Sequence, residues 1–233
     1  MRPVERGDVP VDGAGNPVVF KRYSEARGAL ISLWGEYCSY CEMELDSSLH
    51  VEHVRPKKAK GTNAVDHQLL LAWDNFLLAC SNCNSTKGDT PIVLDDYIWP
   101  DRDNTFRALI YSEAGVITTA PLPVQQKAQK LLELVGLDKT PLTAEMSDRR
   151  WLNRKDAWGK ATRARERLAK NDIIELREQI AEHVADKGYW SIWMTVFQDD
   201  QDMLNRIIKT MPGTSLPCFN AIGEGIERAG GQC

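Results

Sequence analysis

Two cysteine pairs constrain this chain more than any other feature of its sequence. Cys38 and Cys41 form one Cys-x-x-Cys pair, and Cys80 and Cys83 form a second. A single pair is also typical of a redox motif, and unrelated buried cysteines are the alternative. Two pairs that frame one segment favour tetrahedral Zn²⁺ held by four thiolates. The framed segment is longer than an ordinary zinc ribbon, so we expect a structural unit that the metal closes.

Composition narrows the setting in which these cysteines act. No apolar run in the 233 residues reaches membrane-spanning length, and the first residues have no signal-peptide pattern. We therefore expect a cytoplasmic protein without membrane contact, whose six cysteines are metal ligands or free thiols. Cys218 and Cys233 lack partners at metal-binding spacing, and we interpret them as a buried thiol and a frayed tail. The net charge of −4 predicts that any nucleic-acid-binding surface is local.

Hydrophobic periodicity predicts short strands near the cysteines and helices after them. Ser24 is a candidate N-cap for a helix over 25–36, and Thr143 is one for a charged helix or helix pair over 143–170. The other expected elements are strands at 49–54 and 76–79, helices at 65–73 and 81–87, a basic loop at 57–63, a hairpin over 106–119, a helix after Pro123, and two or three helices over 173–228.

The residues around both expected strands and the second cysteine pair form a recognisable pattern. They read Leu49-His50-Val51-Glu52-His53-Val54-Arg55-Pro56-Lys57, then Trp73-Asp74-Asn75-Phe76-Leu77-Leu78-Ala79-Cys80-Ser81-Asn82-Cys83-Asn84-Ser85-Thr86-Lys87-Gly88. This stretch, about residues 38–89, resembles the HNH endonuclease family, also called ββα-metal or His-Me finger nucleases. The resemblance implies an α+β fold: a small zinc-stapled ββα-metal HNH domain with a mainly α-helical C-terminal extension.

The same resemblance implies a role for five side chains. His53 would be the general base, because a neutral imidazole accepts a proton from water near neutral pH. Glu52 and Asn84 would hold a catalytic Mg²⁺ or Mn²⁺ through oxygen atoms. Asn75 would fix the loop that carries His53, and Lys87 could hold a phosphate as a point charge. Asn84 replaces the family's more common final His, and Glu52 replaces the frequent Asp.

Other residues that could take part in nucleic-acid chemistry have simpler interpretations. His50 should point away from the face that carries His53, and we favour a structural role over a phosphate contact. His67 is expected to be structural or on the surface. The long helix carries many cations, which fit either a solvated face with ion pairs or a phosphate-tracking surface. These cations are Arg149, Arg150, Arg154, Lys155, Lys160, Arg163, Arg165, Arg167 and Lys170. The tryptophans at helical spacing are more typical of a core than of base stacking, namely Trp151, Trp158, Trp190 and Trp193.

The predicted domain layout leaves a large region without candidate catalytic residues. We expect a lead and helix at 1–37, the HNH domain at 38–100, and a hairpin plus helical partner- or substrate-binding region at 101–233. The whole layout resembles the HNH subunit of Septu-type antiphage defence systems, which also accompany some retrons. That resemblance implies an ABC/SMC-like ATPase partner and, in some systems, a retron complex. The apolar faces at 131–132 and 207–208 would then be either interface anchors or core.

The sequence thus favours a metal-dependent nuclease whose substrate is nucleic acid, with DNA favoured over RNA. One alternative is a catalytically degenerate, zinc-stabilised module that binds nucleic acid or acts as an adaptor. A second alternative is restriction of DNA without any partner.

Overall fold

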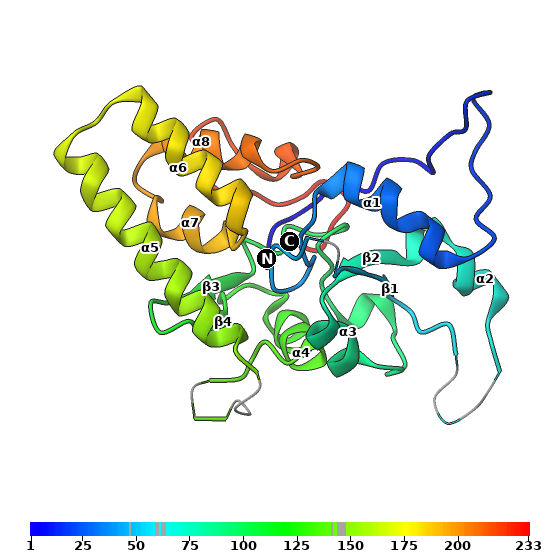
Figure 1. Ribbon diagram of the computed structural model, residues 1–233. Coiled ribbons are helices and arrows are strands. Elements are labelled where there is room, and N and C mark those ends of the chain that lie inside the picture. The colour runs from blue at the N-terminus through cyan, green and yellow to red at the C-terminus, as the bar shows by residue number, and fades with distance from the viewer. Residues whose placement is uncertain (47, 59–60, 62–63, 141, 144–147) are drawn as a thin grey trace.

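The protein mixes helices and short strands, and its C-terminal region is helical. The computed structural model describes residues 1–46, 48–58, 61, 64–140, 142–143 and 148–233. Figure 1 shows α1, α2, β1 and β2 on one side of the molecule, α5–α8 on the other, and α3 and α4 between them. Within the described residues, no helix is both long and apolar enough to cross a membrane.

The N-terminal helix begins slightly earlier than the sequence predicts. A 3-10 turn, η1 (Tyr23–Ala26), leads directly into α1 (Arg27–Trp34). Ser24 therefore lies inside the first turn, and its prediction as the N-cap is wrong. The physical reason is Glu25, whose carboxylate accepts a hydrogen bond at 2.9 Å from the backbone N–H of Lys21. This bond satisfies a donor ahead of the turn and so starts it before Ser24.

The centre of the first half is a two-stranded antiparallel sheet followed at once by a helix. Strand β1 (His50–His53) pairs with β2 (Phe76–Ala79), and α3 (Ser81–Lys87) begins two residues after β2 ends. All four residues of β2 are buried, which explains its uninterrupted apolar sequence. The connection between the strands contains α2 (His67–Leu71) and the 3-10 turn η2 (Trp73–Asn75). Part of the predicted basic loop, at 59–60 and 62–63, lies outside the described residues.

A second small sheet and one amphipathic helix complete this half. The predicted hairpin is confirmed as β3 (Leu109–Tyr111) and β4 (Ile117–Thr119), after a 3-10 turn η3 (Leu94–Asp96). Helix α4 (Gln125–Val135) packs on α3 and β4. Its face at Leu131 and Leu132 is fully buried, so these residues are core and not free interface anchors.

Four helices form the C-terminal region. They are α5 (Arg150–Lys170), α6 (Ile174–Lys187), α7 (Trp190–Val196) and α8 (Gln201–Thr210), followed by a 3-10 turn η4 (Leu216–Cys218). Helix α5 begins at Arg150 and not at Thr143, and residues 144–147 lie outside the described part of the chain. The last helix ends at Thr210, so the prediction of helices as far as residue 228 is only partly right. Ile207 and Ile208 pack inward, and these side chains are core.

The hydrophobic core joins segments from the whole length of the chain. One cluster contains Trp34, Trp99, Leu131 and Cys233 among many others, and a second holds α5–α8 together. Trp190 and Trp193 are buried as predicted, whereas Trp151 and Trp158 are half-buried.

The two unpaired cysteines are both buried. Cys218 is fully buried, as expected. Cys233 is only 2% exposed, and its carbonyl oxygen accepts hydrogen bonds at 3.0 Å from the N–H groups of Asn104 and Arg228. The prediction of a frayed tail is therefore wrong, because these bonds and the burial of the thiol order this segment.

Candidate metal centre and nuclease site

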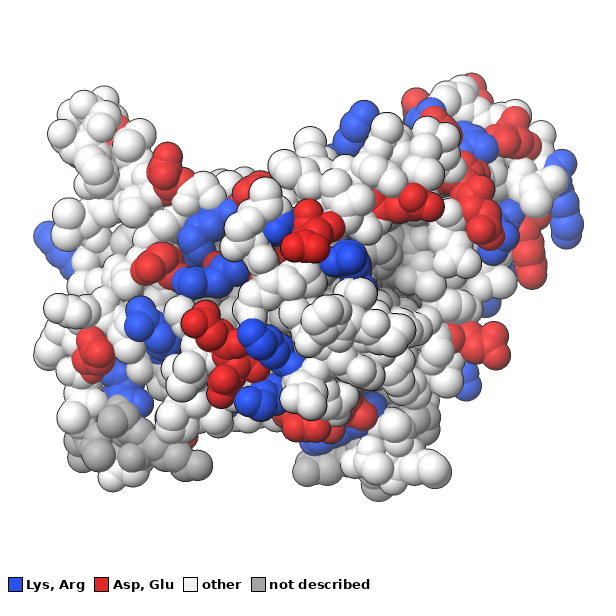
Figure 2. All heavy atoms as spheres, turned by 180° about the vertical axis from the view of Figure 1, so that it is seen from behind, with Lys and Arg blue, Asp and Glu red and all other residues white. Residues whose placement is uncertain are grey.

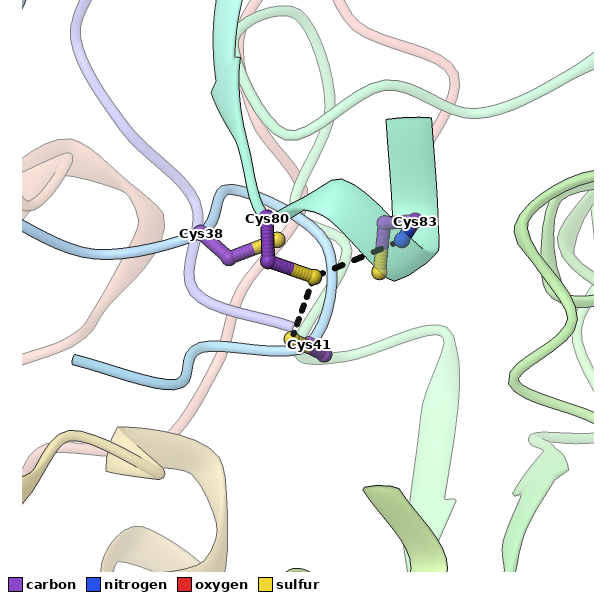
Figure 3. A group of neighbouring side chains, drawn as sticks. All are labelled: Cys38, Cys41, Cys80 and Cys83. Atoms are coloured by element: carbon purple, nitrogen blue, oxygen red, sulfur yellow. Dashed lines mark hydrogen bonds between the residues drawn. The ribbon is translucent and has the colours of Figure 1, made fainter. Parts of the chain in front are cut away.

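The four predicted thiols meet at one point. Their sulfur atoms all lie within 4.8 Å of one another, and all four residues are buried. Figure 3 shows the first pair, Cys38 and Cys41, on one loop, with Cys80 at the end of β2 and Cys83 in the first turn of α3. The sulfurs of Cys41 and Cys80 are 3.7 Å apart. A tetrahedral Zn²⁺ with bonds of 2.3 Å requires sulfur separations of about 3.8 Å, so the cluster fits structural zinc.

The thiols of the cluster differ in acidity. Hydrogen bonds with the neighbouring thiols hold the pKa of Cys80 below its usual range, whereas such bonds and burial raise the pKa of Cys41 and of Cys83 well above it. The backbone N–H of Cys83 also donates to the sulfur of Cys80 at 3.3 Å. Thiolate is the form that ligates metal. Outside the four cysteines, the guanidinium of Arg150 donates to the sulfur of Cys83 at 3.2 Å and brings a positive charge to the cluster.

The loop with the first cysteine pair also contacts the helical region. Glu42 follows Cys41, and its carboxylate accepts a 2.6 Å bond from the hydroxyl of Ser191 on α7. The backbone carbonyl of Glu42 accepts from the N–H of Tyr189 at 2.9 Å. Gly188 has a φ of +71°, and a Cβ there would lie 2.2 Å from that carbonyl. Only glycine permits this close approach of the two backbones.

A separate cavity of about 270 Å³ lies beside β1 and brings together three of the predicted site residues. Glu52 and His53 from β1 line it, and Asn84 from α3 lines it from another element. The sequence cannot place α3 against β1, but the turn at Cys80 does, since Cys80 directly follows the second strand and caps the helix. The cavity therefore collects an imidazole, a carboxylate and a carboxamide.

The imidazole of His53 is oriented for use as a base. Its Nε2 lies 3.1 Å from the backbone carbonyl of Leu70. A carbonyl oxygen only accepts, so Nε2 carries the proton and the Nδ1 lone pair is available. The rings of Tyr23 and Phe76 contact the imidazole edge-on, with centroids 4.9 and 5.2 Å away. Burial lowers the pKa of His53 from 6.5 to about 4, which keeps the ring neutral.

Lys87 does not occupy the position that the sequence predicts for it. Its ammonium is buried, lies 2.7 Å from the Oε1 of Glu52, and donates to the carbonyl oxygen of His53 at 2.8 Å. The expectation of a phosphate contact is therefore wrong. The physical reason is that helical spacing puts Lys87 on the same face of α3 as the core residue Cys83, where it faces β1. Burial raises the pKa of Glu52, and the charge of Lys87 offsets part of that rise.

The two asparagines have different surroundings. The amide of Asn75 holds the backbone next to His53: its Oδ1 accepts from the N–H of Arg55 at 2.8 Å, and its Nδ2 donates to the carbonyl oxygens of Arg55 and Leu69. The side chain of Asn84 is half-buried and makes no hydrogen bond to any residue that the structure describes. Asn75 is therefore committed to the loop, and Asn84 is free to ligate.

Several residues that line the cavity escaped the sequence analysis. Tyr23 and Arg27 come from η1 and α1, before the cysteine pairs, and no motif marks them. Lys57 lies over the ring of Tyr23, with its ammonium 3.6 Å from the centroid. The basic character of the loop that begins at Lys57 was the only signal for this cation. His50 also borders the cavity, as do the other residues of β1. His67 is exposed on α2, as expected.

Comparison with known proteins identifies the segment that carries this site. Residues 38–90 match the family model described as HNH endonuclease. The chain contains an HNH domain. The matched range includes both cysteine pairs, β1, β2 and α3, whereas α1 and α4–α8 lie outside it. A comparison with curated proteins found no match to the chain.

Proposed function

We propose that the protein is a metal-dependent HNH endonuclease that hydrolyses phosphodiester bonds, with DNA as the favoured substrate. One observation carries this proposal: His53, whose Nε2 is bonded to the carbonyl of Leu70 and whose Nδ1 is therefore unprotonated, lines the same cavity as Glu52 and Asn84, inside the segment that matches the family. We further propose that β1, β2 and α3 form the ββα-metal unit and that the four cysteines hold a structural zinc. In this reading, the zinc closes the unit and takes no part in hydrolysis.

Each side chain has a step that its geometry supports. His53 accepts a proton from the attacking water at Nδ1, while its Nε2–H bond to Leu70 holds the ring in place. Glu52 and Asn84 would supply oxygen ligands for Mg²⁺ or Mn²⁺. That cation would stabilise charge on the phosphate and on the leaving oxygen. Asn75 positions the backbone beside His53 and touches no reacting group.

The pair of Glu52 and Lys87 also favours a second candidate function. An ammonium at 2.7 Å already neutralises Glu52, the carboxylate that we propose as metal ligand. If the cation cannot share or displace this contact, the domain would be a zinc-stabilised binding or adaptor module without activity. Metal titration distinguishes the nuclease from the inactive module. A nuclease site must bind Mg²⁺ or Mn²⁺, and this binding must weaken when Glu52 or Asn84 is replaced.

Cleavage assays test the main proposal with a matched histidine control. Purified protein is incubated with plasmid DNA, single-stranded DNA and RNA, with and without added Mg²⁺ or Mn²⁺. Loss of a general base costs about 10²–10⁴-fold, so we expect His53→Ala to lose cleavage while keeping its fold and zinc. His67→Ala, which changes an exposed histidine outside the cavity, should cut normally. Cleavage by His53→Ala at the wild-type rate would refute the mechanism.

We also propose that the region at 101–233 docks an ATPase partner and that the protein serves in antiphage defence. The support for this is the order of motifs along the chain, not any contact in the structure. Because Leu131 and Leu132 belong to the shared core, a chain that ends near residue 120 would lose part of that core. Co-purification with the product of a neighbouring ATPase gene should therefore use the full chain.

A further inference from the structure

The cations of α5 differ in their surroundings. Arg150 and Arg154 are buried and donate to backbone oxygens, so they stabilise the fold. Lys160, Arg163 and Arg167 are exposed, and within the described residues they form no ion pair or side-chain hydrogen bond. Over the face shown in Figure 2, basic and acidic side chains alternate without a broad basic area. A local concentration of unpaired cations is therefore notable.

These three cations line a groove between α5 and α6. Helix α5 packs mainly on α7, and α6 packs mainly on α8, so α5 and α6 leave a cavity of about 380 Å³ between them. Trp193 of α7 forms its floor. The lining residues of α6 recur with helical spacing, namely Leu176, Gln179, Ile180 and His183. An adjoining cavity of about 150 Å³ shares Lys160, His183 and Trp193 and adds Lys187 and Asp156.

Basic side chains line the groove, whereas the acidic side chains of α6 lie outside it. Helix α6 has four acidic residues, and none of them lines the 380 Å³ cavity; they are Glu175, Glu178, Glu182 and Asp186. On α5, Asp156 precedes Lys160 by four residues, the spacing that favours an ion pair, yet the two side chains do not pair. Every formally charged residue of the larger cavity is therefore a cation. A solvated helix face with paired charges does not have this arrangement.

We propose that this groove binds the phosphodiester backbone of nucleic acid and anchors the substrate away from the site of cleavage. The proposal rests on the nuclease function for the identity of the ligand. Lys160, Arg163 and Arg167 lie on one helix face over seven residues, a rise of about 10 Å. That distance matches about three nucleotide steps of a stacked strand. The groove lies among α5–α7, on the opposite side of the molecule from β1 in Figure 1, so a bound strand must extend across the protein.

Binding measurements test the groove separately from catalysis. The variant Lys160→Ala/Arg163→Ala/Arg167→Ala is compared with Lys155→Ala/Lys170→Ala/Lys209→Ala, which removes the same charge from exposed positions outside the groove. Both are made in the full chain with His53→Ala, and a labelled single-stranded DNA oligonucleotide is titrated by fluorescence anisotropy. We expect the groove variant to bind at least about 10-fold more weakly, with the slope of log K against log salt reduced by about 2. The control should weaken binding less than the groove variant does, because Lys155, Lys170 and Lys209 line neither cavity.

Three results would overturn the inference. They are unchanged binding by the groove variant, equal loss in the two variants, or displacement of the oligonucleotide by polyglutamate at equal charge, which would indicate an acidic protein partner instead. Zinc content and circular dichroism establish that both variants fold. In the otherwise wild-type chain, the groove variant should raise KM for a long substrate and leave kcat unchanged. If the wild-type chain cuts nothing but its binding of the oligonucleotide still depends on the groove, the nuclease proposal fails. The proposal that the groove binds nucleic acid then still stands.

Discussion

Arg150 on α5 donates a hydrogen bond from Nη1 to the sulfur of Cys83, at 3.2 Å. The same guanidinium donates to the carbonyl oxygens of Val135 and Gly136 and pairs with Asp148 at 2.7 Å. One buried side chain therefore connects the second cysteine pair, the end of α4 and the start of α5. The HNH domain is therefore bonded to the helical region through one of its candidate metal ligands, Cys83.

This contact predicts that Arg150 supports metal retention. We expect Arg150→Leu to release zinc to a chelator more easily, because loss of a residue that orients a ligand lowers metal affinity by about 10–100-fold. The variant also leaves buried acceptors unpaired and should unfold about 3–5 kcal/mol more easily. A chromogenic chelator and urea denaturation measure the two effects. Arg149→Leu, at the exposed neighbouring position, is the control. Equal zinc release from both variants would contradict the role of Arg150.

The four-cysteine cluster predicts one tightly bound zinc per chain. Elemental analysis of protein purified without added metal should find it, and Cys80→Ser/Cys83→Ser should lose it. Because metal binding contributes directly to folding free energy, the double variant should also unfold at a lower temperature. Cys218→Ser changes a buried cysteine outside the cluster and should keep the zinc. Zinc that survives the double substitution would rule out this ligand set.

The ion pair between Glu52 and Lys87 predicts a large and asymmetric effect on stability. Lys87→Met leaves the buried carboxylate of Glu52 without its partner, and we expect a loss of about 3–5 kcal/mol in the free energy of unfolding. Glu52→Gln/Lys87→Met removes both charges and should be less destabilised than Lys87→Met alone. Urea denaturation of the single and double variants provides the comparison. A double variant as unstable as the sum of its two single variants would show that the pair is not coupled.

The lowered pKa of His53 predicts the pH dependence of cleavage. The neutral ring is the base, and its pKa of about 4 keeps it neutral well below 6.5. The rate should therefore persist as the pH falls through 6.5 and decline only toward pH 4. Over the same interval the folded state should lose stability, because the unfolded chain takes up a proton that folded His53 does not. A pH profile of kcat/KM measures the change in rate. An NMR titration of the histidine signal that is absent from the His53→Ala spectrum gives the pKa of folded His53, on which both statements depend. A fall of kcat/KM on the acid side with its midpoint at pH 6.5 or above would contradict both statements.

The local parts of the site could be predicted from the sequence, whereas its packing could not. Spacing alone predicted the meeting of Cys38, Cys41, Cys80 and Cys83, since metal geometry leaves few alternatives. The strands and α3 followed from short apolar runs and a helix stop at Gly88. Lys87 shows the limit: its position in the motif indicates a cation near the phosphate, but only the packing of α3 on β1 reveals that it is buried against Glu52.

Contacts between segments distant in sequence account for the other differences. Tyr23 and Arg27 reach the cavity because α1 docks beside β2, and no local pattern encodes that docking. The order at Cys233 depends on bonds to Asn104, far away in the chain. The sequence does not distinguish the buried cations of α5 from the exposed ones. Only the tertiary structure shows that Arg154 lies in the core and that Arg163 lies at the groove.

The contact between Gly188 and Glu42 has a consequence for exchanging this domain between proteins. The family match ends at residue 90, so residues 38–90 look like a cassette that another HNH domain could replace. The incoming cassette would need a backbone carbonyl facing Gly188, a carboxylate for Ser191 and a thiolate facing α5. A chimaera built at the family boundaries should therefore assemble poorly, and one that also transplants the partners in α5 and around residues 188–191 should recover.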